Sequence, residues 1–186
     1  MRLVRNPWIW LLRFRKRRGY GVHSPFAYSF VRGVVLEQTP YYAYQRLSEL
    51  HPWWVRWGRF YPLSCRRLLF RLANFAHPGT IRLVGDRPIE RVYLAESVPS
   101  ARWVERGVAD FVFVAAEHVA EAADIAATLP SHAMMVIEGI HRNKDARMVW
   151  HDIQSAPHTG ITFDLYTYGV VFFDLSRHKQ HYKVNF

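Results

Sequence analysis

Residues 111–137 read FVFVAAEHVAEAADIAATLPSHAMMVI, and this stretch decides the fold class. Two uninterrupted apolar runs, Phe111–Val114 and Met134–Ile137, stand at its ends and predict strands that are buried on both faces. The alanine-rich residues 118–128 between them predict a helix. A strand, a helix and a second strand in this order are typical of a parallel pair with a helical crossover, the unit of an α/β fold.

The same alternation continues on both sides of this stretch. Upstream, Ile81–Val84 and Val92–Ala95 are short strand candidates. Downstream, apolar residues recur at helical spacing from Ala146 to Ile153 and predict an amphipathic helix. Three further strand candidates follow, at residues 161–166, 170–173 and 182–184. The connection of residues 166–169 is too short for a parallel crossover, so we expect the last strands to pair antiparallel.

The first part of the chain differs in composition from the rest. The formal net charge is +10, from 25 Lys and Arg against 15 Asp and Glu, and 14 of the basic but only 2 of the acidic residues lie in residues 1–73. This part also holds 16 of the 29 aromatic residues. Its Ser, Thr, Pro and Gly residues predict helices over residues 6–18, 25–36, 39–50 and 64–76. We therefore expect a basic, aromatic-rich helical region, residues 1–73, packed on an α/β domain, residues 74–186.

The composition excludes several classes of protein. Half of the residues are apolar and 16% are aromatic, which is unlike a disordered chain. The single cysteine, Cys65, allows neither an intrachain disulfide nor a cysteine-based zinc site, and the histidines lack metal-ligand spacing, so we predict no metal. No stretch approaches the length of about 18 apolar residues that a membrane-spanning helix needs. We expect a protein that is not transmembrane and is cytoplasmic.

Seven segments form an ordered set of motifs. They are Gly21-Val22-His23-Ser24-Pro25-Phe26, Leu68–Phe75, Asp110–Val114, Val136–His141, Phe163–Leu165, Gly169–Phe173 and Lys179–Tyr182. In this order, and over most of the chain, the set resembles a group of bacterial class I SAM-dependent methyltransferases. The resemblance implies a Rossmann-like, mostly parallel sheet with antiparallel C-terminal strands, and transfer of a methyl group from S-adenosyl-L-methionine (SAM) to an acceptor.

The resemblance also implies a cofactor loop from which this chain departs. Such enzymes hold SAM with a glycine-rich loop, roughly E-x-G-x-x-x-G, after the first strand, and with an acid at the end of the second. Here Arg82 replaces the first acid, Gly85 alone remains of the glycines, and Glu96 follows the second strand candidate. Only seven residues separate the two strand candidates, whereas a parallel crossover needs about a dozen. We expect a sheet shortened in its first half, an eroded SAM site, and two candidates that either pair antiparallel or are not both strands.

Glu138 and His141 are the candidate catalytic residues. The resemblance implies a D-x-x-H motif at the fourth strand and a D-D-I-H motif at the fifth, where this chain has Glu117-His118 and Glu138-Gly139-Ile140-His141. Open α/β sheets bind their ligands at the carboxyl ends of such strands. The pair is either a residual acid and base that removes the acceptor's proton, or a strand end that hydrogen-bonds a loop.

Three functions stay open on these grounds. The first is a divergent family member, a pseudoenzyme with weak or no methyl transfer, that binds another protein or a second copy of itself. The second is an active methyltransferase with a pocket rebuilt around Gly85, Glu96, Glu138 and His141. The third is a module that binds nucleic acid or an anionic membrane surface through its basic arm, against the simpler alternative of a solvated arm. The basic residues of that arm are Arg13, Arg15, Lys16, Arg17 and Arg18.

Overall fold

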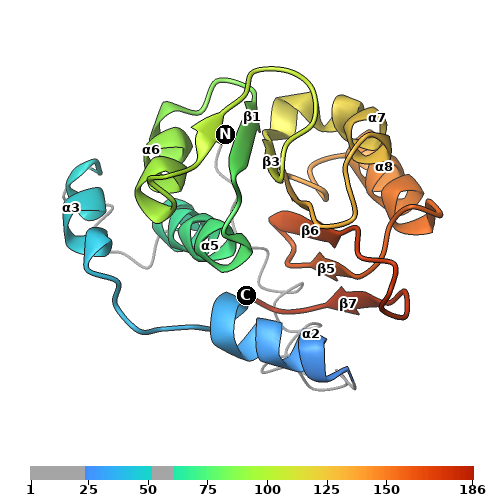
Figure 1. Cartoon of the computed structure of the whole chain (residues 1–186), viewed down its shortest axis with the longest axis horizontal. Coiled ribbons are helices and arrows are strands. Elements are labelled where there is room, and N and C mark those ends of the chain that lie inside the picture. Colours follow the sequence, from blue (N-terminus) through green and yellow to red (C-terminus); the bar gives the residue numbers. More distant parts are fainter. Residues whose placement is uncertain (1–23, 52–60) are drawn as a thin grey trace. The chain divides into compact units, whose positions relative to one another are not determined.

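The computed structural model describes residues 24–51 and 61–186 (Figure 1). The chain has an α/β fold and divides into two compact units. The helical unit takes in Pro88–Pro99, the described residues up to Phe75, and the last two residues of the chain. The sheet unit consists of Ala76–Arg87 and Ser100–Val184.

The sheet unit contains one mostly parallel sheet, seven-stranded over the described residues. Its strands are β1 (Thr80–Val84), β2 (Arg102–Trp103), β3 (Phe111–Val114), β4 (Met134–Glu138), β5 (Thr162–Asp164), β6 (Tyr168–Phe172) and β7 (His181–Lys183), in the spatial order β2-β1-β3-β4-β6-β5-β7. Strands β2, β1, β3 and β4 are parallel, and β7 is parallel to β5. Strand β6 runs antiparallel to both β4 and β5. The parallel pair expected from residues 111–137 is confirmed, as is the antiparallel pairing across residues 166–169. The expectation that the last strands pair antiparallel is wrong for β7, which lies beside β5 and runs parallel to it.

Three helical segments cover one face of this sheet. They are the 3-10 helix η3 (Ala116–Glu121), α7 (Ala122–Ala127) and α8 (Lys144–Ser155), and Figure 1 shows α7 and α8 side by side. Asn143 caps α8, since its side-chain oxygen accepts a hydrogen bond from the amide of Ala146 at 2.7 Å. Trp150 of α8 packs so closely on β6 that a Cβ at Gly169 would lie 2.5 Å from its ring. The helices predicted at residues 118–128 and from Ala146 to Ile153 are confirmed, although the first begins as a 3-10 helix.

The strand predicted at Val92–Ala95 is wrong, because these residues lie in α6 (Pro88–Ser97). Glu90, Tyr93, Leu94 and Ser97 are buried in α6, at the i, i+3, i+4, i+7 spacing of one helix face. The real second strand is β2, which pairs parallel with β1. The crossover from β1 to β2 therefore has room for a helix, α6. The sequence left open whether Ile81–Val84 and Val92–Ala95 pair antiparallel or are not both strands, and the second alternative is correct. A short apolar run cannot by itself distinguish a strand from a buried helical turn.

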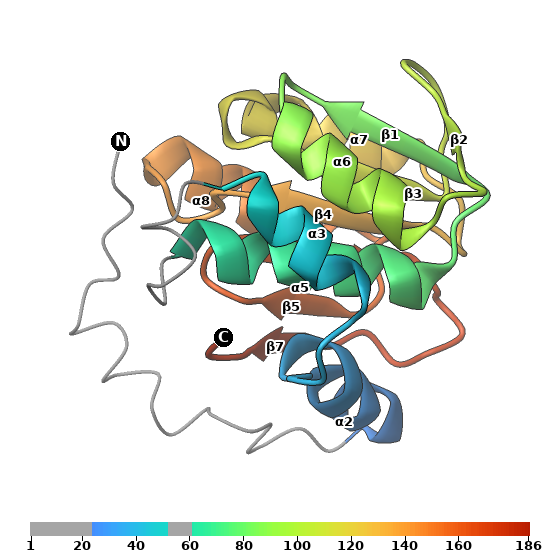
Figure 2. The same ribbon diagram turned by 90° about the vertical axis from the view of Figure 1, so that its left-hand side faces the viewer.

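The helical unit is built from α2 (Pro25–Phe30), the π-helical turn η2 (Val31–Val35), α3 (Ala43–Glu49), α5 (Tyr61–Ala76) and α6. Ser24 caps α2, and Pro25 occupies its first turn, as the sequence predicts. Tyr44, Leu47, Leu63, Phe70 and Tyr93 form a buried cluster in this unit, and α3 lies beside α6 (Figure 2). The helices expected over residues 25–36, 39–50 and 64–76 are confirmed, whereas the one expected over residues 6–18 lies outside the described residues. Among the described helices, none is long and apolar enough to span a bilayer.

Candidate functional site

Four segments of the sheet unit meet at one edge of the sheet. Strands β1, β3, β4 and β5 point in the same direction, because β6 is antiparallel to both of its neighbours. Their carboxyl ends lead into residues 85–87, 115–118, 138–141 and 164–167. This carboxyl edge is where open α/β sheets bind their ligands, so its side chains are the candidate site.

Gly85 allows the segment after β1 to pass very close to the segment after β3. Its φ is +109°, in the region that favours glycine, and an added Cβ would lie 2.7 Å from Cβ of Ala115. Only Asp86 and Arg87 separate this glycine from the start of α6. The conformational freedom of Gly85 therefore serves a close contact within the protein.

The guanidinium of Arg87 binds two carboxylates at the carboxyl edge. Its Nη1 and Nη2 donate to the two carboxylate oxygens of Glu117, at 2.7 and 2.6 Å. Nη2 also donates to Oε2 of Glu138 at 2.9 Å, and Nε lies 3.3 Å from the same oxygen. Glu138 accepts one more hydrogen bond, from the amide of Ala116 at 3.2 Å. We call Arg87, Glu117 and Glu138 the Arg87 triad.

The electrostatics of the triad keep its arginine and Glu117 charged. Burial alone would lower the pKa of Arg87, but its hydrogen bonds to Glu138 and Glu117 outweigh burial and raise that pKa. Burial alone would likewise raise the pKa of Glu117, but hydrogen bonds from its own backbone N–H and from Arg87 bring that pKa below its ordinary value. The triad is therefore a network of charge-assisted bonds across the ends of β1, β3 and β4.

The two residues predicted as a catalytic pair bind different partners. Glu138 belongs to the Arg87 triad, whereas Nε2 of His141 lies 2.9 Å from Oδ2 of Asp164. The side chain of Asp164 is 1% exposed and that of His141 is 24% exposed. The ring of Tyr166 stacks on the imidazole, with centroids 5.5 Å apart and planes 19° apart. His141 therefore forms a dyad with Asp164 and not the predicted pair with Glu138.

Sequence reasoning missed Asp164 and Tyr166 as site residues. Asp164 ends the observed strand β5, whereas the predicted strand ran on to residue 166 and so placed Asp164 in its interior. In addition, 23 positions separate Asp164 from His141 in the chain, so no pattern in the sequence indicated their contact.

Glu96 does not lie at the end of a strand, and the prediction that it does is wrong. It belongs to the last turn of α6 in the helical unit, where it pairs with Arg46 of α3. The acid that does follow the second strand is Glu105, two residues beyond β2 and exposed. Misplacing the second strand therefore also misplaced its terminal acid.

Gly85 and the charged side chains of the carboxyl edge make close contacts within the protein. Arg82, where the resemblance implies an acid, donates from Nη1 to the carbonyl of Gly107 at 3.2 Å. Gly85 is tightly packed, and the carboxylates of Glu117 and Glu138 are engaged by Arg87. In the parts of the chain that the structure describes, no three His, Cys, Asp or Glu side chains are grouped to hold a metal.

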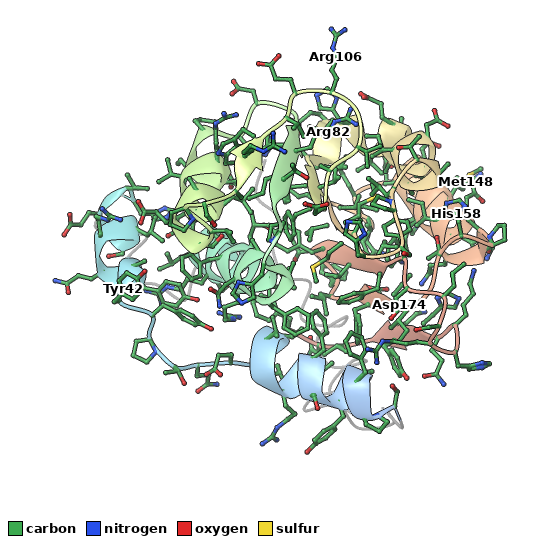
Figure 3. The ribbon with its side chains drawn as sticks, in the orientation of Figure 1. Tyr42, Arg82, Arg106, Met148, His158 and Asp174 are labelled. Atoms are coloured by element: carbon green, nitrogen blue, oxygen red, sulfur yellow. The ribbon has the colours of Figure 1, made fainter. Side chains whose placement is uncertain are left out.

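The basic arm predicted to contact nucleic acid or membranes, Arg13–Arg18, lies outside the described residues. In the sheet unit, the side chain of Arg106 projects away from the ribbon (Figure 3).

Comparison with models of known protein families finds no match, and no curated protein matches the chain.

Proposed function

We propose that the chain is a divergent relative of the class I SAM-dependent methyltransferases, with weak or no methyl transfer, that acts by binding a partner. The Arg87 triad carries this proposal. Its charged side chains occupy the carboxyl ends of β1, β3 and β4, where an open α/β sheet takes its ligand.

The energetics of the triad support weak cofactor binding. A ligand that reached the ends of β1 and β3 would have to displace Arg87 from Glu117, Glu138 or both. Separating a buried ion pair without replacing it costs about 3–5 kcal/mol, and less where the side chains are partly exposed, as these are. A cost of even about 1.4 kcal/mol weakens binding tenfold.

Isothermal titration of the full chain with SAM and with S-adenosylhomocysteine tests the proposal. We expect no saturable binding up to about 1 mM ligand. Saturable binding in the micromolar range contradicts the eroded site. Arg87→Ala and the control Arg106→Ala refine the result: tight SAM binding gained only by Arg87→Ala means that the triad blocks an otherwise intact pocket.

The partner is proposed to be another protein or a second copy of the chain. Light scattering after size exclusion tests the second copy, because a dimer has twice the 21.9 kDa mass of the chain. A species that stays at the monomer mass at every concentration leaves another protein as the partner.

A second candidate function is favoured by one observation. The His141–Asp164 dyad joins a partly exposed imidazole to a buried carboxylate, an arrangement typical of a general base. An active methyltransferase would use this dyad, with Glu105 in the place of Glu96 beyond the second strand. Methyl transfer from labelled SAM to a hydroxyl acceptor, lost in His141→Ala, would favour this candidate over the first.

A further inference from the structure

A chain of hydrogen bonds joins three helices inside the helical unit. Nη1 of Arg66, on α5, lies 3.1 Å from Nδ1 of His51, which stands two residues beyond the end of α3. Nε2 of His51 lies 3.0 Å from the hydroxyl of Tyr93 on α6, and that hydroxyl donates to the carbonyl of Leu47 on α3 at 3.3 Å. His51 is 3% exposed, so this chain of bonds runs through the interior of the unit. We call Arg66, His51, Tyr93 and Leu47 the His51 relay.

We propose that His51 is a pH-sensitive latch, which holds α3 to α5 and α6 while its imidazole is neutral and releases α3 when the imidazole takes up a proton. Its basis is the direction of each hydrogen bond in the relay. The latch requires neither SAM nor a binding partner, so it goes beyond the proposed function.

The guanidinium of Arg66 determines the state of the imidazole. A guanidinium stays charged and can only donate, so Nδ1 of His51 accepts from it and carries no proton. The proton of the neutral imidazole is then on Nε2, which donates to the hydroxyl of Tyr93. Burial raises the pKa of Tyr93 to about 12, so this hydroxyl keeps its own proton and donates it to Leu47. The neutral Nε2–H imidazole therefore satisfies every member of the relay.

A proton on Nδ1 of His51 is incompatible with this arrangement. It would direct two N–H donors, one from Arg66 and one from His51, at each other, and it would bury a second positive charge beside the guanidinium. Glu90, the buried acid of α6, already accepts from Nε of Arg66 at 2.8 Å. Protonation of His51 must therefore break its bond to Arg66, and with it the tie between α5 and the end of α3.

The other charged groups around the relay do not compensate an imidazolium. The charged or titratable side chains that act on the Tyr93 hydroxyl are Arg66 and Arg67 of α5, Tyr44 of α3 and Glu90 of α6. The remaining acids of α3 and α6 are Glu49, which is exposed, and Glu96, which pairs with Arg46. Residues 1–23 and 52–60, outside the described residues, contain no Asp or Glu. The carboxyl end of a helix such as α3 favours a cation more weakly than a buried donor without an acceptor disfavours it.

The latch weakens in acid. An unfolded histidine has a pKa of about 6.5. The imidazole of latched His51 stays neutral as the pH falls through this value, whereas the released imidazole takes up a proton. The released state therefore binds more protons and is favoured in acid. Between pH 7.5 and pH 5.5 the equilibrium constant for release should rise about tenfold.

Hydrogen–deuterium exchange of the full chain, followed by mass spectrometry of peptides, measures the release of α3. After correction for the intrinsic pH dependence of amide exchange, we expect α3 to exchange about tenfold faster at pH 5.5 than at pH 7.5 in the wild type. His51→Gln should remove this difference, because its side-chain amide supplies an acceptor for Arg66 and a donor for Tyr93 and does not titrate. The matched control His178→Gln, which alters an exposed histidine of the sheet unit, should keep the difference.

Side-chain NMR of the histidines gives an independent readout in the wild-type protein. We expect His51 as the neutral Nε2–H tautomer at pH 7.5. Circular dichroism establishes that each variant is folded, and if His51→Gln does not fold, the tautomer and the exchange of the wild type decide. An Nδ1–H tautomer or an imidazolium at pH 7.5, an α3 that exchanges no faster in acid, or the same acceleration in folded His51→Gln overturns the proposal. None of these outcomes bears on SAM binding, so the two proposals fail separately.

Discussion

Nη2 of Arg87 lies 2.9 Å from Oε2 of Glu138, although 51 positions separate the two residues in the chain. The same nitrogen lies 2.6 Å from Oε2 of Glu117. One cation therefore holds two carboxylates together at the carboxyl ends of three strands, and its removal has a measurable consequence.

Arg87→Met should lower the free energy of unfolding by about 1–3 kcal/mol at pH 7, because it leaves two carboxylates close together without their cation. Urea unfolding followed by circular dichroism measures the change. Arg106→Met is the matched control, since it removes the same charge from an exposed side chain. Equal midpoints for the two variants would contradict a stabilising triad.

The difference between wild type and Arg87→Met should shrink in acid. The pKa of Glu117 lies below its ordinary value of 4.5 in the folded protein, through hydrogen bonds that outweigh the effect of burial. Its contribution is therefore fully present above pH 4.5 and is lost as the pH falls through the folded value. Repeating the urea titrations from pH 7 down to pH 3.5 checks this sign, and a difference that grows in acid would refute it.

Arg71→Met should destabilise the helical unit. The side chain of Arg71 is buried, and it donates to the carbonyls of Val34 and Val35 at 2.7 and 3.0 Å. These carbonyls end the π-helical turn η2, and losing their charged donor should cost about 2–3 kcal/mol. Thermal unfolding compares the variant with Arg32→Met, which alters an exposed arginine of the same turn. A similar melting temperature for both would mean that the buried arginine is dispensable.

Gly169→Ala should destabilise the sheet unit by about 2 kcal/mol or more, because the new methyl group would overlap the buried ring of Trp150. Gly33→Ala is the control, since a Cβ there meets no atom within 4 Å. That change should be neutral or stabilising by up to about 1 kcal/mol, because alanine favours helix over glycine. The denaturant midpoint should therefore fall in Gly169→Ala and should stay unchanged or rise in Gly33→Ala. Tolerance of alanine at position 169 would mean that α8 shifts freely on β6.

His181→Gln should reduce the sensitivity of folding to mild acid. Burial, together with the charges of Lys179 and His151, lowers the pKa of His181 below 6.5. The folded state therefore binds fewer protons than the unfolded state just below pH 6.5, and stability is lost as the pH falls through this range. Midpoints at pH 7.5 and 5.5 should differ less in the variant than in the wild type. His178→Gln, which alters a neighbouring histidine in the chain, should keep the wild-type difference.

Local pattern accounts for the central part of the fold. The uninterrupted apolar runs became β3 and β4, and the alanine-rich stretch between them became η3 and α7. Pattern failed at Val92–Ala95, because Tyr93 and Leu94 are buried as part of a helix face. That error hid both the crossover and the true second strand. For the candidate site, the sequence pattern identified Glu138 and His141 as residues that follow a strand. It predicted that the two form a pair, whereas Glu138 binds Arg87 and His141 binds Asp164.

The sequence by itself determined the strand–helix–strand unit of residues 111–137 and the antiparallel β5–β6 pair. Both follow from local physics: an apolar run without polar interruption must be buried on two faces, and a four-residue connection cannot cross over a sheet. Only the tertiary structure decided that Arg87 meets Glu117 and Glu138, and that His141 meets Asp164. Strand order and register place these side chains at one edge, and those depend on how β1, β3, β4, β6 and β5 pair over long separations. No local pattern carries that information, because each charged residue has the same appearance in the sequence whichever partner it meets.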